Sequence, residues 1–404
     1  MSIPINKFIN VDFKIIQKSP TIGSYKTVVY VIPDSFKVDS ETVQMTLCSK
    51  YEVSSDKTLK VYNDKGTEIT ELSSEIKENI RTYFNNGGVR LLLLKPTQYT
   101  NDAFLNDLEK ARTIASDFIY VVINNTICDS SSGFTHEVLK EIAKTLDTYT
   151  SPYTTRLLLT KNLINEGTID YTYIDDFKNY NVGIKFCSKK INGKVLDAAL
   201  LIGAYFSKVN LDNYQSIKDY CYTEETLLNS SGEEDSAENV SGEEYENLVA
   251  KNYNFIDKTS KFTVNFGGNL ANGVSLHTDF GTICVENDIC FATLDTIMGK
   301  QYLNESGLTN VVATINSQLQ RYKNNGYLHT NTNYSGEDLN IEYDNTSYRV
   351  IDKGSTLPQG FYIFTIPISQ ISALDKLEKR FTPIYVVMET LYGARTVTIQ
   401  GEVR

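Results

Sequence analysis

Three stretches near the end of the chain have distinct residue patterns. They read GFYIFTIP at 360–367, SALDKLEKRFTP at 372–383 and IYVVMETLYGARTVTIQ at 384–400. The first and the last are rich in β-branched and aromatic residues, which favour strands. The middle stretch carries several lysine and arginine residues and reads as a basic helix. We therefore predict the order strand, helix, strand, a Gly393-Ala394 break and an alternating final strand.

The opposite end of the chain also alternates. Between residues 7 and 16, polar residues separate Val11, Phe13 and Ile15. A period of two residues predicts a strand. The polar stretch 17–26 that follows offers no obvious hairpin partner. This terminal strand therefore needs the edge of a sheet somewhere else.

Length and composition indicate a folded chain with more than one structural unit. The 404 residues are too many for one ordinary core, and they suffice for two domains or for one large domain with an insertion. Apolar residues make up 41% and charged residues 22%, which is far from the composition of disordered proteins. The net charge of -11 argues against nucleic acid as a partner, because affinity for phosphate backbones comes mainly from lysine and arginine.

Cysteine usage and the first residues predict an intracellular protein outside the membrane. The six cysteines are scattered without a CxxC pair, which fits a reducing compartment and lacks zinc-site spacing. The first residues, MSIPINKFIN, lack the features of a signal peptide. No stretch reaches the roughly eighteen consecutive apolar residues of a membrane span. We expect neither secretion by that route nor direct membrane insertion.

Residues 24–215 alternate between apolar runs and helical patterns. Strands are predicted at 27–32, 89–94, 118–123, 156–160 and 182–187, and helices at 74–84, 101–112, 135–146 and 194–208. Strands separated by single helices are usually parallel, since a crossover connection needs about a dozen residues or more. This part of the chain therefore predicts a multi-layer α/β domain.

Residues 216–256 contain an acidic segment that we expect to be a flexible insertion or linker. From Glu224 to Glu246 there are nine acidic residues and no lysine or arginine, and the tetrapeptide Ser-Gly-Glu-Glu occurs twice. This composition is typical of a solvated, mobile loop. The alternative is an outward-facing or calcium-binding segment, although the DxDxDG spacing of a calcium loop is missing.

Residues 257–393 predict a second domain, of the α+β class. Short strands are expected near 262–266 and 281–285, and helices near 288–299 and 308–324. The last helix has one apolar stripe at helical spacing, which indicates core packing and no cofactor site. The stripe consists of Val311, Val312, Ile315, Leu319 and Tyr322.

Residues suited to catalysis are scarce. No phosphate-binding loop, dinucleotide fingerprint, nucleophile elbow or HExxH motif occurs, and the chain has three histidines. The best enzymatic pair is Cys128 with His136, which we interpret as a strand-end cysteine and a helix-start histidine. Gly267-Gly268 predicts a turn and not a phosphate nest. We expect a chain that is not an enzyme and that uses no cofactor and no metal.

Both ends of the chain and one internal turn resemble tail sheath proteins of contractile phages (myoviruses) and of related R-type tailocins. The resemblance rests on the strand, helix and strand order after Gly360, on the Arg380–Pro383 junction and on the Gly393-Ala394 break. The sequence Asn-Asn-Gly-Gly at 85–88 also resembles a turn before a strand in such proteins. The resemblance implies that 257–393 is the sheath domain and that 1–23 and 394–404 are extended arms.

The resemblance also implies a function. Sheath subunits resemble tiles stacked in rings around a tube, and each donates its terminal arms to a sheet of its neighbours. Here Val11, Phe13 and Ile15 would serve at one end, and Val397, Ile399 and Val403 at the other. Such a homopolymer contracts by lattice repacking, drives the inner tube through the cell envelope and permits genome ejection. The implied partners are the tail tube, baseplate and tail terminator proteins, and the implied location is the virion tail, assembled in the bacterial host cytoplasm.

The predicted basic helix from Ala373 to Phe381 has two interpretations. Its basic residues Lys376, Lys379 and Arg380 suit a weak electrostatic contact with an acidic tube surface. Alternatively, the helix is simply solvated and its charges pair along the helix.

Two other classes of protein stay open. Another tail component, such as a tube or baseplate subunit, also polymerises by strand exchange, although tube proteins are typically small β-domains. The second alternative is an α/β hydrolase or transferase with an unrecognised motif. Long hollow cylinders of purified protein would exclude an enzyme, whereas a stable monomer with a filled pocket would favour one.

Overall fold

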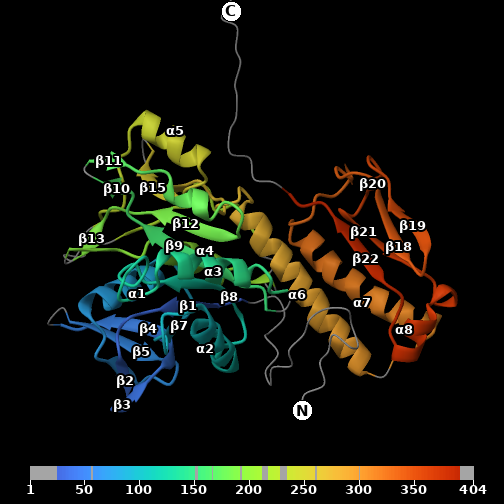
Figure 1. Ribbon diagram of the computed structural model, residues 1–404, viewed down its shortest axis with the longest axis horizontal. Coiled ribbons are helices and arrows are strands. Elements are labelled where there is room, and N and C mark those ends of the chain that lie inside the picture. Colours follow the sequence, from blue (N-terminus) through green and yellow to red (C-terminus); the bar gives the residue numbers. More distant parts are fainter. Residues whose placement is uncertain are drawn as a thin grey trace, which may run out of the picture.

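The computed structural model describes residues 25–55, 58–150, 153–165, 167–191, 193–211, 217–227, 234–259, 262–299 and 301–391. A larger α/β unit and a smaller unit lie on the two sides of helix α6 (Leu276–Met298), as Figure 1 shows. The protein thus has the mixed α/β and α+β character that the sequence predicts. The limits 24–215 and 257–393 for the two domains stay a prediction.

A ten-stranded sheet forms the centre of the larger unit. One half of it is parallel, in the order β12-β9-β8-β1-β7. These strands are β1 (Thr27–Val31), β7 (Arg90–Leu94), β8 (Phe118–Ile123), β9 (Arg156–Lys161) and β12 (Val182–Phe186). Every residue of β1, β8 and β12 is buried, as expected of a sheet covered on both faces. The parallel arrangement predicted from the alternation of strands and helices is confirmed.

Helices cover both faces of the parallel half. Helices α1 (Ser74–Asn85) and α4 (Ala199–Ser207) share an apolar cluster with Val28 and Tyr30 of β1. Helices α2 (Asn101–Ile114) and α3 (His136–Leu146) share the opposite cluster with Val29 and Val31. The side chains of β1 thus divide alternately between two cores, because successive residues of a strand point to opposite faces.

The prediction of a helix over 194–208 is wrong at its start. The hairpin β13 (Lys190–Ile191) and β14 (Lys194–Val195) precedes the helix, which begins only at Ala199. The turn predicted at 85–88 follows α1, where Gly87 has φ of +87°. Glycine accepts this left-handed conformation without a steric penalty.

The other half of the sheet is antiparallel and was not predicted. It follows β7 in the order β4-β5-β6-β2-β3. Its strands are β2 (Phe36–Val38), β3 (Glu41–Val43), β4 (Met45–Val53), β5 (Leu59–Asn63) and β6 (Glu68–Thr70). These strands are short or partly exposed, so their apolar content is a weak sequence signal.

The described part of the acidic segment contains a helix and a buried carboxylate, and the flexible insertion expected over 216–256 stays a prediction. In its described part, helix α5 (Gly242–Ala250) begins with a capping box formed by Ser241 and Glu244, and Leu248 is buried. Glu225 is also buried and contacts Lys185. Acidic residues in the first turn of a helix stabilise it, so part of the charge run is a helix start. After it, β15 (Phe255–Lys258) and β16 (Thr263–Phe266) form a hairpin beside β12.

The strand predicted near 281–285 is wrong. Those residues belong to α6, which continues through the predicted helix 288–299. A short apolar run does not distinguish a buried strand from a buried helix, and tertiary packing decided. Gly281 marks a close approach in α6, because a Cβ there would lie 2.2 Å from Cζ of Tyr327.

Helix α7 (Glu305–Asn324) packs against α6 and carries the predicted stripe. Its buried members include Val311, Ile315, Leu319 and Tyr322, which confirms the prediction of core packing, whereas Val312 is half-buried.

The smaller unit continues with β17 (Thr332–Asn333), β18 (Leu339–Tyr343), β19 (Thr346–Ile351), β20 (Thr356–Leu357), β21 (Phe361–Thr365), α8 (Ala373–Glu378) and β22 (Ile384–Met388). Short pairs β17–β20 and β18–β19 are antiparallel. A small hairpin of β10 (Ile164–Asn165) and β11 (Thr168–Ile169) completes the larger unit.

Candidate assembly surface

The strands β21 and β22 form an antiparallel hairpin between α7 and the β18–β19 hairpin (Figure 1). On one face, Ile363 and Val386 join the apolar cluster that contains the buried residues of α7. On the other face, Phe364 and Val387 join the cluster that includes the end of β19. Both faces are therefore covered, and an added strand can approach only along an edge.

The edges of this hairpin carry no third strand among the residues that the structure describes. Beyond β22, Thr390 forms an isolated bridge with Leu328, and the amide of His329 donates to the carbonyl of Glu389 at 2.8 Å. Within the described part of the chain, the strand residues 361–365 and 384–388 themselves pair only with each other. Unpaired edge groups are a template for another strand.

The large sheet differs from the hairpin at its edges. Along β12, the amide of Phe186 donates to the carbonyl of Asn254 at 2.7 Å, and the amide of Ala271 donates to the carbonyl of Val182 at 2.8 Å. At the opposite edge, β3 has three residues and includes the exposed Glu41. Short, charged or covered edges resist intermolecular pairing. The β21–β22 hairpin is therefore the better acceptor for a foreign strand.

The arm residues predicted to be donated are not part of the described structure. Val11, Phe13 and Ile15, and likewise Val397, Ile399 and Val403, lie outside the described residues. The structure does place the adjoining residues. Tyr25 is buried at the start of β1, and the amide of Leu391 donates to the carbonyl of Tyr327 at 2.9 Å.

The predicted tube-facing residues lie on and just after α8. This helix ends before the predicted Phe381, because Lys379 adopts a left-handed conformation with φ of +57°. Lys376 and Lys379 are exposed and form no ion pair with any described residue. Arg380 instead pairs with Glu378 at 2.8 Å. The structure thus places the exposed charges of Lys376 and Lys379 on one surface, whereas the charge of Arg380 is already paired with a carboxylate.

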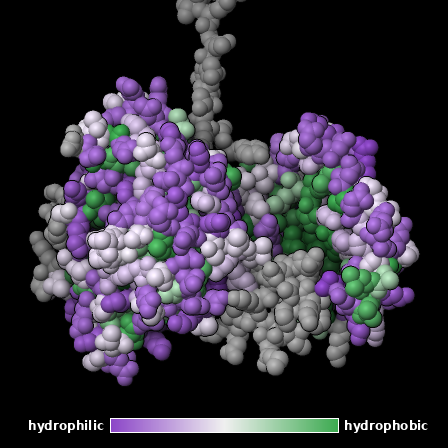
Figure 2. Space-filling model, viewed as in Figure 1, coloured by the Kyte–Doolittle hydropathy of each residue, from purple (hydrophilic) through white to green (hydrophobic). Residues whose placement is uncertain are grey.

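Helix α8 also exposes two leucines. Leu374 is 60% and Leu377 is 80% exposed, and Figure 2 shows apolar atoms where Figure 1 places α8. The carboxylate of Asp375 faces the rest of the smaller unit, since it accepts a hydrogen bond from Tyr343 Oη at 2.7 Å. The exposed surface of α8 thus carries two leucines and two lysines beside the exposed Glu378, which pairs with Arg380.

The candidate enzymatic pair has no catalytic geometry. Burial raises the pKa of the Cys128 thiol to about 12, so the thiol stays protonated at neutral pH. Both ring nitrogens of His136 face carboxylates, at 3.1 Å from Asp129 Oδ1 and 2.9 Å from Asp176 Oδ2. The imidazole is engaged in this surface network. The predicted turn at Gly267-Gly268 is present, with φ of +94° and +90°.

Metal clusters and membrane-spanning helices are both absent from the described ranges. No group of three or more histidine, cysteine or acidic side chains there could hold a metal ion. Nor does any helix in the described part of the chain combine the length and the apolar character needed to cross a bilayer.

Comparison with solved structures decides the fold. A chain of the anti-feeding prophage helical sheath in its contracted state superposes with a TM-score of 0.62 over 95% of both chains, at 13% identity. A chain of the anti-feeding prophage baseplate gives a TM-score of 0.60, covering 97% of this chain and 98% of the other, also at 13% identity. The chain has the contractile tail sheath fold. No protein-family model and no curated protein sequence matches it.

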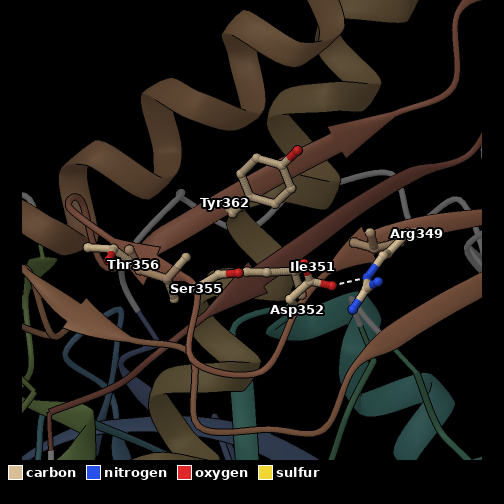
Figure 3. A pocket seen from close by; sticks show the side chains of 8 residues that line it. Arg349, Ile351, Asp352, Ser355, Thr356 and Tyr362 are labelled. Atoms are coloured by element: carbon tan, nitrogen blue, oxygen red, sulfur yellow. Dashed lines mark ion pairs between the residues drawn. The ribbon is translucent and has the colours of Figure 1, made fainter.

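Sequence reasoning missed two surface features of this sheath fold. The first is the pair of exposed leucines on α8, whose spacing of three residues on a basic helix was an available signal. The second is a groove beside β21 that Figure 3 shows, lined in part by Tyr362. That groove joins β19, β20 and β21, and sequence patterns do not report how separate strands pack together.

Proposed function

We propose that this chain is a structural subunit of a contractile tail sheath. Subunits polymerise as a helical tube of stacked rings around an inner tail tube, and the lattice contracts to drive that tube through a cell envelope. The observation that carries the proposal is the β21–β22 hairpin, whose edges are unpaired in the described structure of a chain with the sheath fold. The large sheet of the same chain has covered or short edges, so it is a poorer acceptor for an added strand than β21–β22.

Terminal strand exchange joins the subunits. The arm at 1–23, with Val11, Phe13 and Ile15, and the arm at 394–404 would add to β21–β22 hairpins of neighbours. Main-chain hydrogen bonds then supply affinity, and alternating side chains fix the register. Because donor and acceptor surfaces differ, each contact is heterologous and the assembly grows without closing.

Helix α8 contacts the inner tube in this proposal. Lys376 and Lys379 offer exposed positive charge, and Leu374 and Leu377 add apolar area. Exposed charge pairs are weak and screened by salt, so many such contacts can release together as the sheath widens. Arg380 is a weaker candidate, since it already pairs with Glu378.

Contraction needs no nucleotide in this mechanism. The extended lattice is a metastable state, and rigid units repack into a wider lattice while the arms stay paired. The chain therefore acts as a structural protein without a cofactor and not as an enzyme. Its further partners are baseplate and tail terminator proteins, and its location is a virion or tailocin tail assembled in the bacterial host cytoplasm.

A baseplate role is the second candidate function. It is favoured by the superposition on a chain of the anti-feeding prophage baseplate. Purified protein distinguishes the two, because a sheath subunit extends into long hollow cylinders, whereas a baseplate component stops at closed rings or small assemblies.

Truncation of the arms tests the proposal. Deleting residues 1–18 or 394–404 should leave a folded, soluble protein that forms no cylinders in negative-stain micrographs. A matched control carries the residues 1–18 in shuffled order, which keeps composition and length but destroys the alternation. Normal cylinders from either truncation would refute strand exchange, and cylinders from the shuffled chain would show that register does not depend on Val11, Phe13 and Ile15.

A further inference from the structure

A buried lysine, a carboxylate and a carboxamide meet where β12 adjoins the β15–β16 hairpin. Lys185 of β12, Glu225 and Asn265 of β16 are 0%, 4% and 0% exposed. The ammonium Nζ of Lys185 donates to Asn265 Oδ1 at 2.9 Å and contacts one carboxylate oxygen of Glu225. The hydroxyl of the buried Tyr220 lies 2.7 Å from the same Nζ and contacts the other oxygen of Glu225. Three polar side chains from separate segments thus surround one nitrogen atom.

The backbone holds the lysine and the asparagine in fixed positions. Lys185 pairs with Thr160 in the parallel sheet and forms a bridge with Asn254 on its other side. Asn265 lies within the β15–β16 hairpin, and its amide also donates to the carbonyl of Thr223 at 2.8 Å. Reacting groups that a fold holds in contact reach effective concentrations of about 10⁵ M or more. The amine and the carboxamide therefore need no further approach before they can react.

Burial prepares Lys185 to act as a nucleophile. Loss of water around the ammonium group lowers the pKa of Lys185, although the carboxylate of Glu225 opposes that shift. Transfer of one proton from Nζ to this carboxylate leaves a neutral amine beside a neutral carboxyl group, which suits a site without water. The amine then carries a free electron pair that can attack the carbon of a carboxamide.

The carboxamide of Asn265 is unevenly paired. Its Oδ1 accepts a hydrogen bond from Lys185, whereas its buried Nδ2 finds no hydrogen-bond partner among the described residues. A buried amide nitrogen that donates to nothing has lost its hydration without compensation. Departure of this nitrogen as ammonia removes that penalty. A role of Asn265 as a simple acceptor for the ammonium group leaves the unsatisfied Nδ2 unexplained.

We propose that Lys185 and Asn265 form an intramolecular isopeptide bond, with Glu225 as the proton carrier. The bond between Nζ and Cγ of Asn265 forms, and the bond between Cγ and Nδ2 breaks. Of the three protons on the ammonium group, one stays on the new amide nitrogen, and two pass by way of Glu225 to Nδ2, which leaves as ammonium. Glu225 ends as a carboxylate, and no oxidant or cofactor takes part.

The bond would close a covalent loop between β12 and β16. Lys185 and Asn265 are 80 residues apart, and the loop includes helix α5. A cross-link of this kind restricts the unfolded chain and thereby stabilises the folded one. The reaction occurs once in each chain, so it is a self-modification without turnover. The inference goes beyond the proposed function, because the chemistry needs only one subunit.

Mass spectrometry of the unsubstituted full-length chain tests the bond. Its intact mass in denaturing solvent, counted with or without Met1, should be about 17 Da below the mass of the sequence, because one ammonia is lost. After trypsin digestion, the fragments 179–189 and 262–300 should be joined, since an acylated Lys185 is no longer a cleavage site. The full mass of the sequence would overturn the inference.

Other mass losses would also overturn it. A loss of about 18 Da, one water, would mean that Lys185 had joined the carboxyl group of Glu225 instead. A loss of one ammonia that maps to another fragment, such as one with an unlinked Lys185, would place the reaction at a different asparagine. Either result is read from the unsubstituted chain and does not depend on the folding of a variant.

Two matched variants test the proton carrier. Glu225→Gln keeps the size of the side chain and removes its base, so we expect the full mass of the sequence. Glu238→Gln is the control, because this half-buried carboxylate accepts from the amide of Ser188 at 3.1 Å, and we expect its chain to keep the loss of one ammonia. The joined fragments in Glu225→Gln would overturn the role of Glu225. Neither readout involves cylinders, so a failure here leaves the proposed function standing.

Discussion

The guanidinium group of Arg156 on β9 donates three hydrogen bonds to the carboxylate of Asp279 on α6, at 2.8, 2.9 and 3.1 Å. Both side chains are nearly buried. This ion pair links the first turn of α6 to the parallel half of the ten-stranded sheet. Further along α6, Asp288 accepts hydrogen bonds from Tyr322 of α7 at 2.7 Å and from Tyr25 at 3.4 Å. Helix α6 is thus bound by buried polar contacts to both units of the chain.

Removal of one partner of the first pair should be costly. Arg156→Met leaves the carboxylate of Asp279 buried without its partner, so we expect a loss of about 3–5 kcal/mol in the free energy of unfolding. The double variant Arg156→Met, Asp279→Leu should recover most of that loss, since neither charge is then buried. Urea unfolding followed by circular dichroism gives both values. Equal stability of the single variant and the original chain would show that the pair is solvated in solution.

The buried carboxyl of Asp197 should make stability depend on pH. It accepts hydrogen bonds from Asn79 Nδ2 at 3.0 Å and from the amide of Asn125 at 2.7 Å, and also contacts Tyr30. Burial nevertheless raises its pKa to about 7, above the ordinary value of 3.8. Between these two values the folded chain holds a proton that the unfolded chain has lost, so stability falls as pH rises through this window, by up to about 1.4 kcal/mol per pH unit.

Asp197→Asn should flatten this dependence, because an amide does not titrate. Unfolding free energies measured at intervals from pH 4 to pH 8 in both chains isolate the contribution, since the other titrating groups are common to both. Parallel curves for the two chains would mean that Asp197 titrates at its ordinary pKa.

Glu225 should hold the segment 217–227 on the body of the protein. It contacts the ammonium group of Lys185, which is fully buried and also donates to Tyr220 Oη at 2.7 Å and to Asn265 Oδ1 at 2.9 Å. Burial lowers the pKa of Lys185, and the carboxylate of Glu225 opposes that shift. Glu225→Ala leaves this charge without its carboxylate, which we expect to cost about 3–5 kcal/mol.

The same change should release the segment locally. Trypsin cleavage after the exposed Lys218, followed by mass spectrometry, should become faster in Glu225→Ala than in the original chain. The double variant Lys185→Met, Glu225→Met serves as the control, because it removes both charges and should restore resistance. Unchanged cleavage in Glu225→Ala would mean that other contacts hold the segment.

Charge reversal on α8 should affect tube binding and not self-assembly. Lys376→Glu with Lys379→Glu should abolish salt-sensitive co-sedimentation with purified cylinders of the accompanying tail tube protein, because attraction becomes repulsion. The variant should still form sheath-like polymers by itself, since α8 lies in the connection between β21 and β22 and is part of neither strand. Lys353→Glu is the matched control on another surface of the same unit, where it pairs with Glu337. Tube binding that survives the double reversal would favour a solvated α8.

Local patterns were sufficient for the parallel half of the sheet and for the apolar stripe of α7. The strand β8 consists entirely of buried apolar residues, and helices with caps such as Ser73 surround such strands. A continuous apolar run bounded by polar turns is compatible with few structures other than a buried strand. The strand, helix and strand order from 361 to 388 also followed from its residues, whereas the predicted final strand lies outside the described residues.

Only the tertiary structure decided the features that depend on distant partners. Residues 281–285 lie within α6, where Gly281 leaves room for the ring of Tyr327, a residue far along the chain. In the described part of the acidic segment, Glu225 contacts the buried Lys185 from a distant strand. The groove beside β21 likewise needs Val350, Leu357 and Tyr362 brought together from three strands. The sequence alone determined where strands and helices are favoured, because those preferences are local. Which edges stay unpaired and which charges become buried depend on packing between distant segments, and only the folded chain shows that.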